Sequence, residues 1–265
     1  MNNIIQLNKF ATLHNNKNIY FCKTDFIGAL FAQLQNSSTD CTLITGNSDY
    51  EINDYMTAHA PSCIKKWYAQ NANTTLDLVS GIPMGIENSE HCILAAHGVG
   101  WDHAKEKVKV LVDPPEISPT RNLYANFSLS THPSREMIYQ LCKDLKYITT
   151  NISLNHSEIN NKPYTNYIKD ILDHKMVVCP RGNGIDCHRV WEVLYLGRIP
   201  IIKKENAMRY FEELPIIILN DWEELQDLPL IEEHYNKVKD NTMRMLDINF
   251  WKTKILEESE DARTN

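Results

Sequence analysis

Short apolar runs rich in β-branched and aromatic residues alternate along this chain with segments whose apolar residues recur at helical spacing. In the first half this pattern predicts a helix over 26–34 and strands over 18–23, 41–45, 66–70 and 78–83. In the second half it predicts helices over 135–145, 164–172 and 186–196, and strands over 123–128, 147–150, 176–179, 199–202 and 215–219. Strands that alternate with helices form parallel sheets, so we expect an α/β fold.

A proline-rich break divides the chain. The segment 112–119 holds three prolines, which exclude a regular helix or a central strand. We therefore predict one domain over 1–115 and a second over 116–240, followed by a C-terminal segment over 241–265. A helix over 243–256 in that segment is expected to return to the first domain.

Composition excludes several classes of protein. The net charge of −7 argues against general nucleic-acid binding, and the chain has no apolar run long enough for a membrane span and no secretory signal at its start. Seven scattered cysteines without a Cys-x-x-Cys pair argue against a disulfide framework and a zinc site, and for a reducing compartment. We expect a cytoplasmic protein, and the sequence does not indicate its oligomeric state.

One glycine-rich turn carries the strongest functional signal. Gly182, Asn183 and Gly184 stand between an apolar strand and a helix, where glycines permit positive φ and let backbone N–H groups approach a ligand. The partial positive charge of the helix N-terminus favours a phosphate at this place. The spacing matches neither the Walker A loop nor the dinucleotide-binding fingerprint, so a nucleoside triphosphatase and a Rossmann dehydrogenase are poorly supported.

The helix after this turn carries charges although apolar residues surround its axis. Asp186, Arg189 and Glu192 recur every three residues and form one charged stripe. Buried charges are costly unless they are paired or used, so the stripe is either an internal ion network or a face of a ligand cleft. In the second reading Arg189 neutralises phosphate and Glu192 accepts sugar hydroxyls. His188 either contacts the same ligand or bonds a backbone carbonyl.

Basic residues also gather around this turn. Six Lys and Arg residues stand against two acidic residues between Lys175 and Lys204, in a chain that is acidic as a whole. This local excess favours an anionic ligand.

The motif from Pro180 to Pro200, Pro-Arg-Gly-Asn-Gly-x-Asp-x-His-Arg-x-Trp-Glu-x-Leu-x-x-Gly-x-x-Pro, resembles the signature of exostosin-like glycosyltransferases. It is most similar to the branch that contains ribitol xylosyltransferase and the xylosyltransferases of large algal viruses. The segments 127–136, 68–71 and 82–85 resemble further elements of the same family. This resemblance implies a GT-B fold, with two Rossmann-like domains facing a central cleft and the donor bound by the second domain.

The resemblance further implies an inverting glycosyltransferase that moves a sugar, with xylose favoured, from a UDP-sugar to a hydroxyl of a glycan or glycoprotein. The chain contains no Asp-x-Asp, the carboxylate pair that holds a metal on the pyrophosphate in the other major transferase fold. We therefore expect no essential metal or other cofactor. Arg135 and Arg181 are candidates for neutralising the leaving diphosphate instead.

Inversion requires a base on the acceptor hydroxyl, and in a GT-B enzyme this base comes from the first domain. Asp49, which follows a predicted strand, is our first candidate, and Asp25 is its rival, with His97 and Asp102 next. Both Asp49 and Asp25 could instead be helix N-caps.

Two other classes of function compete with glycosyl transfer. One is a catalytically inactive protein that binds a nucleotide sugar or a glycan, which the charged residues of the motif disfavour. The other is a hydrolase or phosphatase, which lacks support because the chain has no Gly-x-Ser-x-Gly elbow and no cysteine-phosphatase loop.

Overall fold

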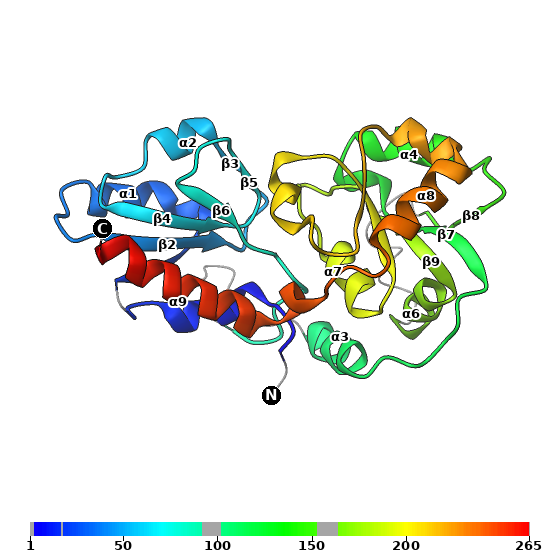
Figure 1. The fold of residues 1–265 in the computed structure, drawn as a ribbon, viewed down its shortest axis with the longest axis horizontal. Helices are drawn as coiled ribbons and strands as arrows, with labels where there is room; N and C mark the ends of the chain where they lie inside the picture. The colour runs from blue at the N-terminus through cyan, green and yellow to red at the C-terminus, as the bar shows by residue number, and fades with distance from the viewer. Residues whose placement is uncertain (1–2, 17, 92–101, 153–163, 265) are drawn as a thin grey trace.

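The computed structural model describes residues 3–16, 18–91, 102–152 and 164–264, and it holds two parallel sheets in them, one in each half of the chain (Figure 1). The first sheet has the order β1-β2-β4-β6 and the second the order β11-β10-β9-β7-β8, with a small pair β3-β5 beside the first. The strands are β1 (Ile19–Lys23), β2 (Cys41–Gly46), β3 (Ile52–Asn53), β4 (Ile64–Ala69), β5 (Ala72–Asn73), β6 (Val79–Gly81), β7 (Arg121–Ala125), β8 (Ile148–Thr150), β9 (His174–Val178), β10 (Ile199–Lys203) and β11 (Ile217–Leu219).

All strand pairs in these sheets are parallel, and each strand of the two main sheets coincides with or overlaps a run predicted from the sequence. The predicted α/β class with two parallel-sheet domains is therefore confirmed. The pair β3-β5 was not predicted, because strands of two residues leave no periodic pattern to detect.

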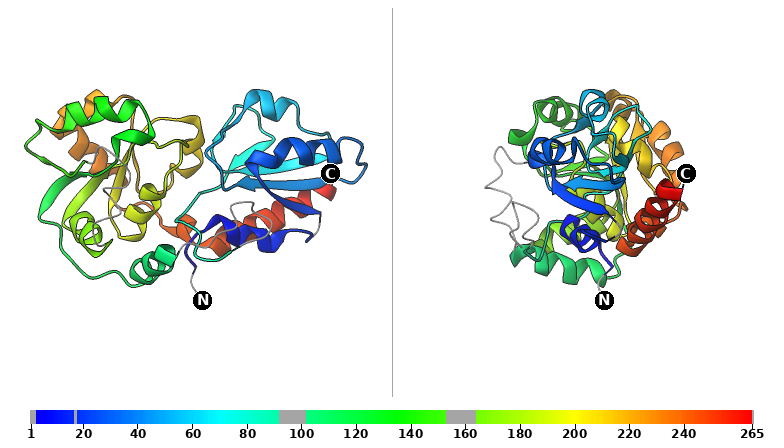
Figure 2. Two further views of the ribbon diagram at one scale, coloured as in Figure 1. Left: turned by 180° about the vertical axis from the view of Figure 1, so that it is seen from behind. Right: turned by 90° about the vertical axis from the view of Figure 1, so that its left-hand side faces the viewer.

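Helices cover both faces of each sheet (Figures 1 and 2). The helices are α1 (Ile27–Leu34), α2 (Asp54–Ala58), α3 (Asp102–Val112), α4 (Ser134–Cys142), α6 (Tyr164–Leu172), α7 (His188–Tyr195), α8 (Leu228–Val238) and α9 (Ile248–Thr264). Short 3-10 helices lie over Leu7–Leu13, Thr24–Phe26, Leu129–Thr131, Asn206–Phe211, Trp222–Gln226 and Arg244–Leu246.

The second sheet shows how strand periodicity fills two cores. Successive residues of a strand point to opposite faces, so Met176 and Val178 of β9 pack in one core while Val177 packs in the other. The first core contains Ile138 of α4, and the second contains Ile171 of α6. A parallel strand buried on both faces reads as a continuous apolar run, which is why β9 was recognisable from sequence.

The C-terminal helix α9 packs against β4 of the first sheet and lies beneath that sheet in Figure 1. The Tyr68 hydroxyl of β4 donates a hydrogen bond to Glu258 of α9, and Lys66 forms an ion pair with the same carboxylate at 3.1 Å. Trp251 and Ile255 of α9 are fully buried in a core that also contains residues of the second domain. The helix thus ties the chain's end to both domains.

The start of α4 differs from the sequence prediction. The sequence favours Ser134 as an N-cap of a helix over 135–145, but Pro133 occupies the cap position and Ser134 is the first helical residue. The Ser134 hydroxyl lies 2.7 Å from Nδ1 of His132 instead of bonding a helical N–H group. The prediction was wrong because a local side-chain partner competes for the hydroxyl.

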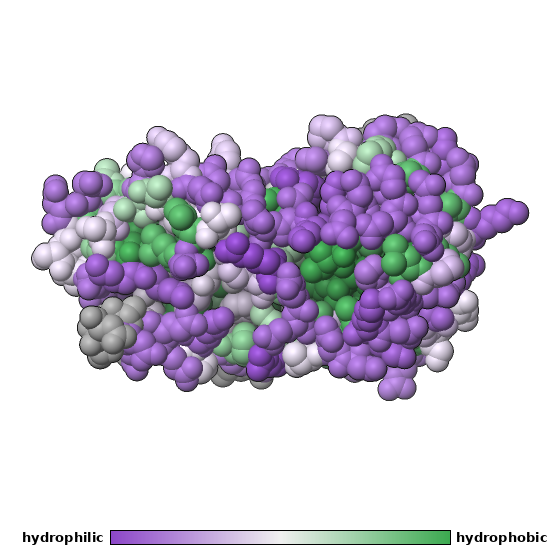
Figure 3. Space-filling view, turned by 45° about the horizontal axis from the view of Figure 1, so that its top comes forward, coloured by the Kyte–Doolittle hydropathy of each residue, from purple (hydrophilic) through white to green (hydrophobic). Residues whose placement is uncertain are grey.

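The surface view shows mostly hydrophilic residues, with apolar residues gathered in patches on both domains (Figure 3). Within the described part of the chain, no helix is both long and apolar enough to cross a bilayer.

Candidate functional site

A cavity of about 910 Å³ lies between the two domains, at the carboxyl ends of strands from both sheets. Loops that follow β2 and β6 line it from the first domain, and loops that follow β7, β8 and β9 line it from the second. The residues that line the cavity include Asp49, Met84, Glu87, Lys107, Asn126, Thr131, Arg135, Tyr164, Tyr167, Gly182, Asn183, Gly184, Asp186, Cys187, His188, Arg189 and Glu192. Ligands of parallel α/β proteins bind at this edge of a sheet.

The predicted glycine turn forms part of the cavity wall, and one of its glycines, Gly184, is required for its small size. Neither Gly182 nor Gly184 has positive φ. A Cβ atom on Gly184 would lie 2.9 Å from Nδ2 of Asn71 and 3.5 Å from Cα of Asp49. The turn therefore needs glycine because a loop of the first domain packs directly against it.

Arg135 fixes the backbone conformation of the turn through hydrogen bonds. It is 4% exposed, and its Nε, Nη1 and Nη2 atoms donate to the carbonyl oxygens of Arg181, Ser128 and Pro180 at 2.8, 2.9 and 3.1 Å. Burial, together with the charge of Arg189, lowers the pKa of Arg135 to about 10. Arg135, which was predicted to bind the diphosphate, lines the cavity, but its guanidinium already donates to three backbone carbonyls.

Arg181 was also predicted to neutralise the diphosphate, and the structure does not bring its side chain to the main cavity. It lines a separate cavity of about 200 Å³, together with His132 and Lys203. Its Nη2 atom donates to the carbonyl of Asn183 at 3.3 Å. Arg181 thus lies outside the lining of the main cavity, and its predicted role toward the diphosphate stays a prediction.

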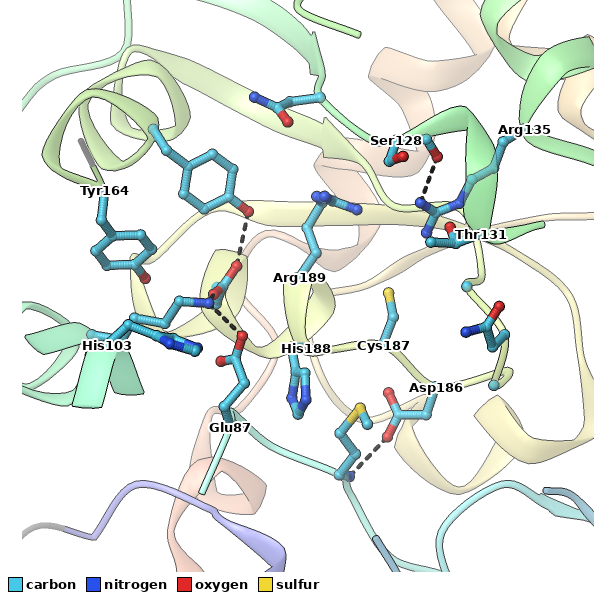
Figure 4. A pocket seen from close by; sticks show the side chains of 18 of the residues that line it. Glu87, His103, Ser128, Thr131, Arg135, Tyr164, Asp186, Cys187, His188 and Arg189 are labelled. Carbon is cyan, nitrogen blue, oxygen red and sulfur yellow. Dashed lines mark hydrogen bonds and ion pairs between the residues drawn. The ribbon is translucent and has the colours of Figure 1, made fainter. Parts of the chain in front are cut away.

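Arg189 points into the main cavity from the first turn of α7 (Figure 4). Its Nε atom is buried without a hydrogen-bond partner, and no ion pair engages the guanidinium in the described part of the chain. The N-cap residue Cys187 makes no side-chain capping bond, so the helix N-terminus is also open toward the cavity. A permanent cation beside an open helix N-terminus is arranged for an anion.

Glu192 lies one turn further along α7, where it is 3% exposed and belongs to a network that we call the Lys107 cluster: Glu87, Lys107, Tyr167 and Glu192. Lys107 of α3 donates to Oε1 of Glu87 at 2.5 Å and to Oε1 of Glu192 at 2.6 Å (Figure 4). Tyr167 donates to Oε2 of Glu192 at 2.8 Å. Glu192 was predicted to bind a sugar, but both of its carboxylate oxygens already accept hydrogen bonds from within the protein.

The Lys107 cluster also sets the charge of Glu87. Burial alone would raise the pKa of this carboxyl, but the positive charges of His188 and Lys107 and the hydrogen bond from Lys107 lower it to about 2. Glu87 is consequently ionised throughout the physiological pH range.

The remaining polar residues of the motif join the two domains. Asp186 is 3% exposed and accepts from the backbone N–H of Met84 and from Nε1 of Trp191, both at 2.8 Å. Burial raises the pKa of Asp186 to about 6, against the opposing effect of these two hydrogen bonds. His188 lies 2.8 Å from the carbonyl of Gly85, which matches the predicted alternative of a backbone contact.

Asn71 completes this joint. Its Oδ1 atom accepts from the backbone N–H of Asp186 at 2.8 Å, and its Nδ2 atom donates to the carbonyl of Ser48 at 3.2 Å. Asp186, Arg189 and Glu192 of the predicted stripe therefore have different surroundings and do not form one ion network.

The candidates for the base occupy different places. Asp49 is exposed and lines the cavity next to the glycine turn. Asp25 does not line the cavity; its carboxylate pairs with Lys23 at 3.0 Å, and burial is outweighed by hydrogen bonds from Ser48 and Lys23 that lower its pKa. His97 lies outside the described residues, and so does the side chain of Asp102, the first residue of α3.

Unsatisfied polar atoms concentrate at this cavity. Seven buried side-chain polar atoms in the described part of the chain lack a hydrogen-bond partner, and four of them belong to residues that line it: Glu87, Thr131, Tyr164 and Arg189. Because buried polar groups are almost always paired, this concentration indicates a polar ligand. Of these four, the sequence pointed only to Arg189, since the others lie outside any local motif.

No group of three or more His, Cys, Asp or Glu side chains is placed to hold a metal ion in the ranges that the structure describes. Independence from metal stays a prediction.

The described residues form two parallel-sheet domains with a polar cavity between them, and the Nε atom of Arg189 in its wall has no hydrogen-bond partner among them. The family model of the RXYLT1 C-terminal domain matches residues 111–261, more than half of the chain, and the chain belongs to this family. The match supports the ribitol xylosyltransferase branch that the Pro180–Pro200 motif resembles, and it places the chain among glycosyltransferases.

Among solved structures, a crystal structure of α1,3-fucosyltransferase is similar to this chain at 12% sequence identity and a TM-score of 0.49. The similarity covers 95% of this chain and 80% of that one. No curated protein matches the sequence.

Proposed function

We propose that this protein is an inverting glycosyltransferase that binds a UDP-sugar in the cavity between its domains and transfers the sugar to a glycan hydroxyl. The observation that carries the proposal is Arg189, which lines the cavity and whose Nε atom is buried without a hydrogen-bond partner in the described part of the chain. The family match to the RXYLT1 C-terminal domain favours xylose as the transferred sugar.

In this proposal the diphosphate lies against Arg189, the open N-terminus of α7 and the backbone of the Gly182–Gly184 turn. These groups stabilise the negative charge that develops on the leaving nucleoside diphosphate. Because fixed cationic and N–H groups supply this stabilisation, transfer proceeds without an essential metal.

The base in this proposal is Asp49. Its carboxylate comes from the first domain and lines the cavity, and its Cα atom lies close to Gly184 of the turn. Asp25 lacks this position, and Lys23 neutralises it. Abstraction of the acceptor proton by Asp49, with attack on the face of the sugar opposite the diphosphate, gives inversion.

Titration calorimetry with UDP tests the proposal. Arg189→Ala should weaken UDP binding by about 1.5–3 kcal/mol, the range for a charge-assisted hydrogen bond. Arg121→Ala is the matched control, because it removes an arginine of β7 whose side chain is 57% exposed, and it should leave the UDP affinity unchanged. UDP-xylose turnover with an acceptor panel should persist in EDTA.

An Arg189→Ala variant that binds UDP like the wild type would remove the main support for this site. Turnover abolished by EDTA and restored by Mn²⁺ would contradict metal independence alone.

A further inference from the structure

Glu87 lines the cavity, and one of its two carboxylate oxygens has no hydrogen-bond partner from another residue that the structure describes. Its Oε1 atom is held by Lys107 at 2.5 Å, while its Oε2 atom is buried without a hydrogen-bond partner in the described part of the chain. The residue belongs to the loop after β6, in the first domain, and lines the cavity beside α7 of the second domain (Figure 4). A desolvated carboxylate oxygen without a partner is costly, which indicates that a ligand atom completes it.

Lys107 places this free oxygen next to Glu192. The same Nζ atom binds Oε1 of both carboxylates, so the two carboxyl groups are held side by side. The sequence motif assigns acceptance of sugar hydroxyls to Glu192, yet Lys107 and Tyr167 already occupy both of its oxygens. Glu87 therefore offers the free acceptor at the position where the motif predicts one.

The charge of Glu87 decides what kind of group it can bind. Lys107 and His188 keep the carboxyl ionised, so it accepts hydrogen bonds and donates none. A negative oxygen repels phosphate, so the matching groups of the sugar nucleotide are its neutral donors, which are the hydroxyls of its two sugars and the N3–H of uracil.

We propose that Glu87, and not Glu192, accepts a hydrogen bond from a hydroxyl of the sugar nucleotide, either of its ribose or of the sugar to be transferred. Glu192 is then a positioning residue that, through Lys107, orients the Glu87 carboxylate. Because Glu87 comes from the first domain and Arg189 from the second, the nucleotide sugar contacts both domains. This inference rests on the proposed binding of a UDP-sugar in the cavity.

Two variants separate the free oxygen from the ion pair. Glu87→Gln keeps the shape of the side chain and removes its charge. Glu87→Asp keeps a charge for Lys107 but draws the carboxylate back from the cavity by about one bond length. Glu90→Gln, an exposed carboxylate on the same loop, is the matched control. Thermal unfolding of each variant establishes that it is folded before binding is measured.

Titrations with UDP, 2′-deoxy-UDP and UDP-xylose distinguish the two sources of the hydroxyl. If Glu87 binds the ribose, both Glu87 variants should bind UDP about tenfold or more weakly. If it binds the transferred sugar, UDP affinity stays within about twofold, and the advantage of UDP-xylose over UDP is lost. The 2′-deoxy compound shows whether the ribose 2′-hydroxyl is the group concerned.

Either pattern of loss supports the proposal. Folded Glu87→Gln and Glu87→Asp variants that bind UDP and UDP-xylose like the wild type would overturn it while leaving the proposed function intact. A wild-type protein that binds none of the three nucleotides would overturn the proposed function, and this inference with it.

Discussion

Replacing Lys107 with methionine tests the Lys107 cluster most directly. The side chains of Lys107, Glu87 and Glu192 are 15%, 19% and 5% exposed, so the variant leaves two carboxylates facing each other with little solvent. At 2.6 Å and an effective dielectric constant of about 20, the Lys107–Glu192 pair alone attracts by roughly 6 kcal/mol before desolvation is subtracted. Breaking a buried ion pair by removing one partner costs about 3–5 kcal/mol of unfolding free energy, which we expect here.

The pH dependence of this loss has a definite sign. In the wild type the pKa of Glu87 falls from its usual 4.5 to about 2, so its contribution to stability is complete above pH 4.5 and disappears as pH falls toward 2. Without Lys107, burial is the largest remaining influence and raises the pKa of Glu87. The variant should then recover stability relative to the wild type as pH falls from about 7.5 to 5.

Urea unfolding at several pH values between 5 and 8 measures this difference. Lys237→Met is the matched control, because Lys237 and Glu233 form an exposed pair on α8, with side chains 62% and 60% exposed. That variant should lose less than about 0.5 kcal/mol. A Lys107→Met variant within about 1 kcal/mol of the wild type at pH 7.5, or a difference that does not change with pH, would refute the reasoning.

Two further predictions concern the loops on either side of the cavity. Asp49→Asn should lower the transfer rate by about 10²–10⁴-fold while UDP affinity stays unchanged, and Asp25→Asn should not; the opposite result in paired rate and binding assays would move the base to Asp25. Gly184→Ala adds a Cβ atom 2.9 Å from Nδ2 of Asn71 and should lower the unfolding free energy by about 1–3 kcal/mol, as measured with urea. Its control is Gly28→Ala in α1, where no atom lies within 4 Å, and equal stability of the two variants would show that the turn is not packed as described.

Strands such as β9 and β10 were predictable because burial on both faces gives them a run of apolar residues. The residues at which the strands begin and end were harder to predict. The sequence predicts a strand over 176–179, whereas β9 begins at His174. This histidine is 2% exposed because its ring nitrogens pair with the Asp170 carbonyl and the Thr149 hydroxyl. A buried polar residue gives no apolar signal, so the predicted strand began two residues after β9 does.

The location of the site was also predictable from a local sequence pattern, but the roles of its individual residues were not. A glycine turn between a strand and a helix placed the Gly182–Gly184 segment at the cavity without any tertiary information. The partners that decide the tasks lie far away in sequence. Lys107 is 85 residues from Glu192, and Arg135 is 46 residues from the Arg181 carbonyl that it binds. A motif shows which residues gather, but a side chain's task depends on which of its atoms remain free.

That criterion gives the charged motif different meanings at its different positions. Asp186 accepts a hydrogen bond from the backbone N–H of Met84 and so holds the motif loop to the first domain. Glu192 is fully occupied within the Lys107 cluster. Arg189 alone of the three charged residues keeps a buried polar atom without a partner in the described structure. A charge that is expensive to bury persists only when something pairs with it. Under the proposed function an anionic ligand pairs with Arg189, whereas Asp186 and Glu192 of the predicted stripe already bind groups within the protein.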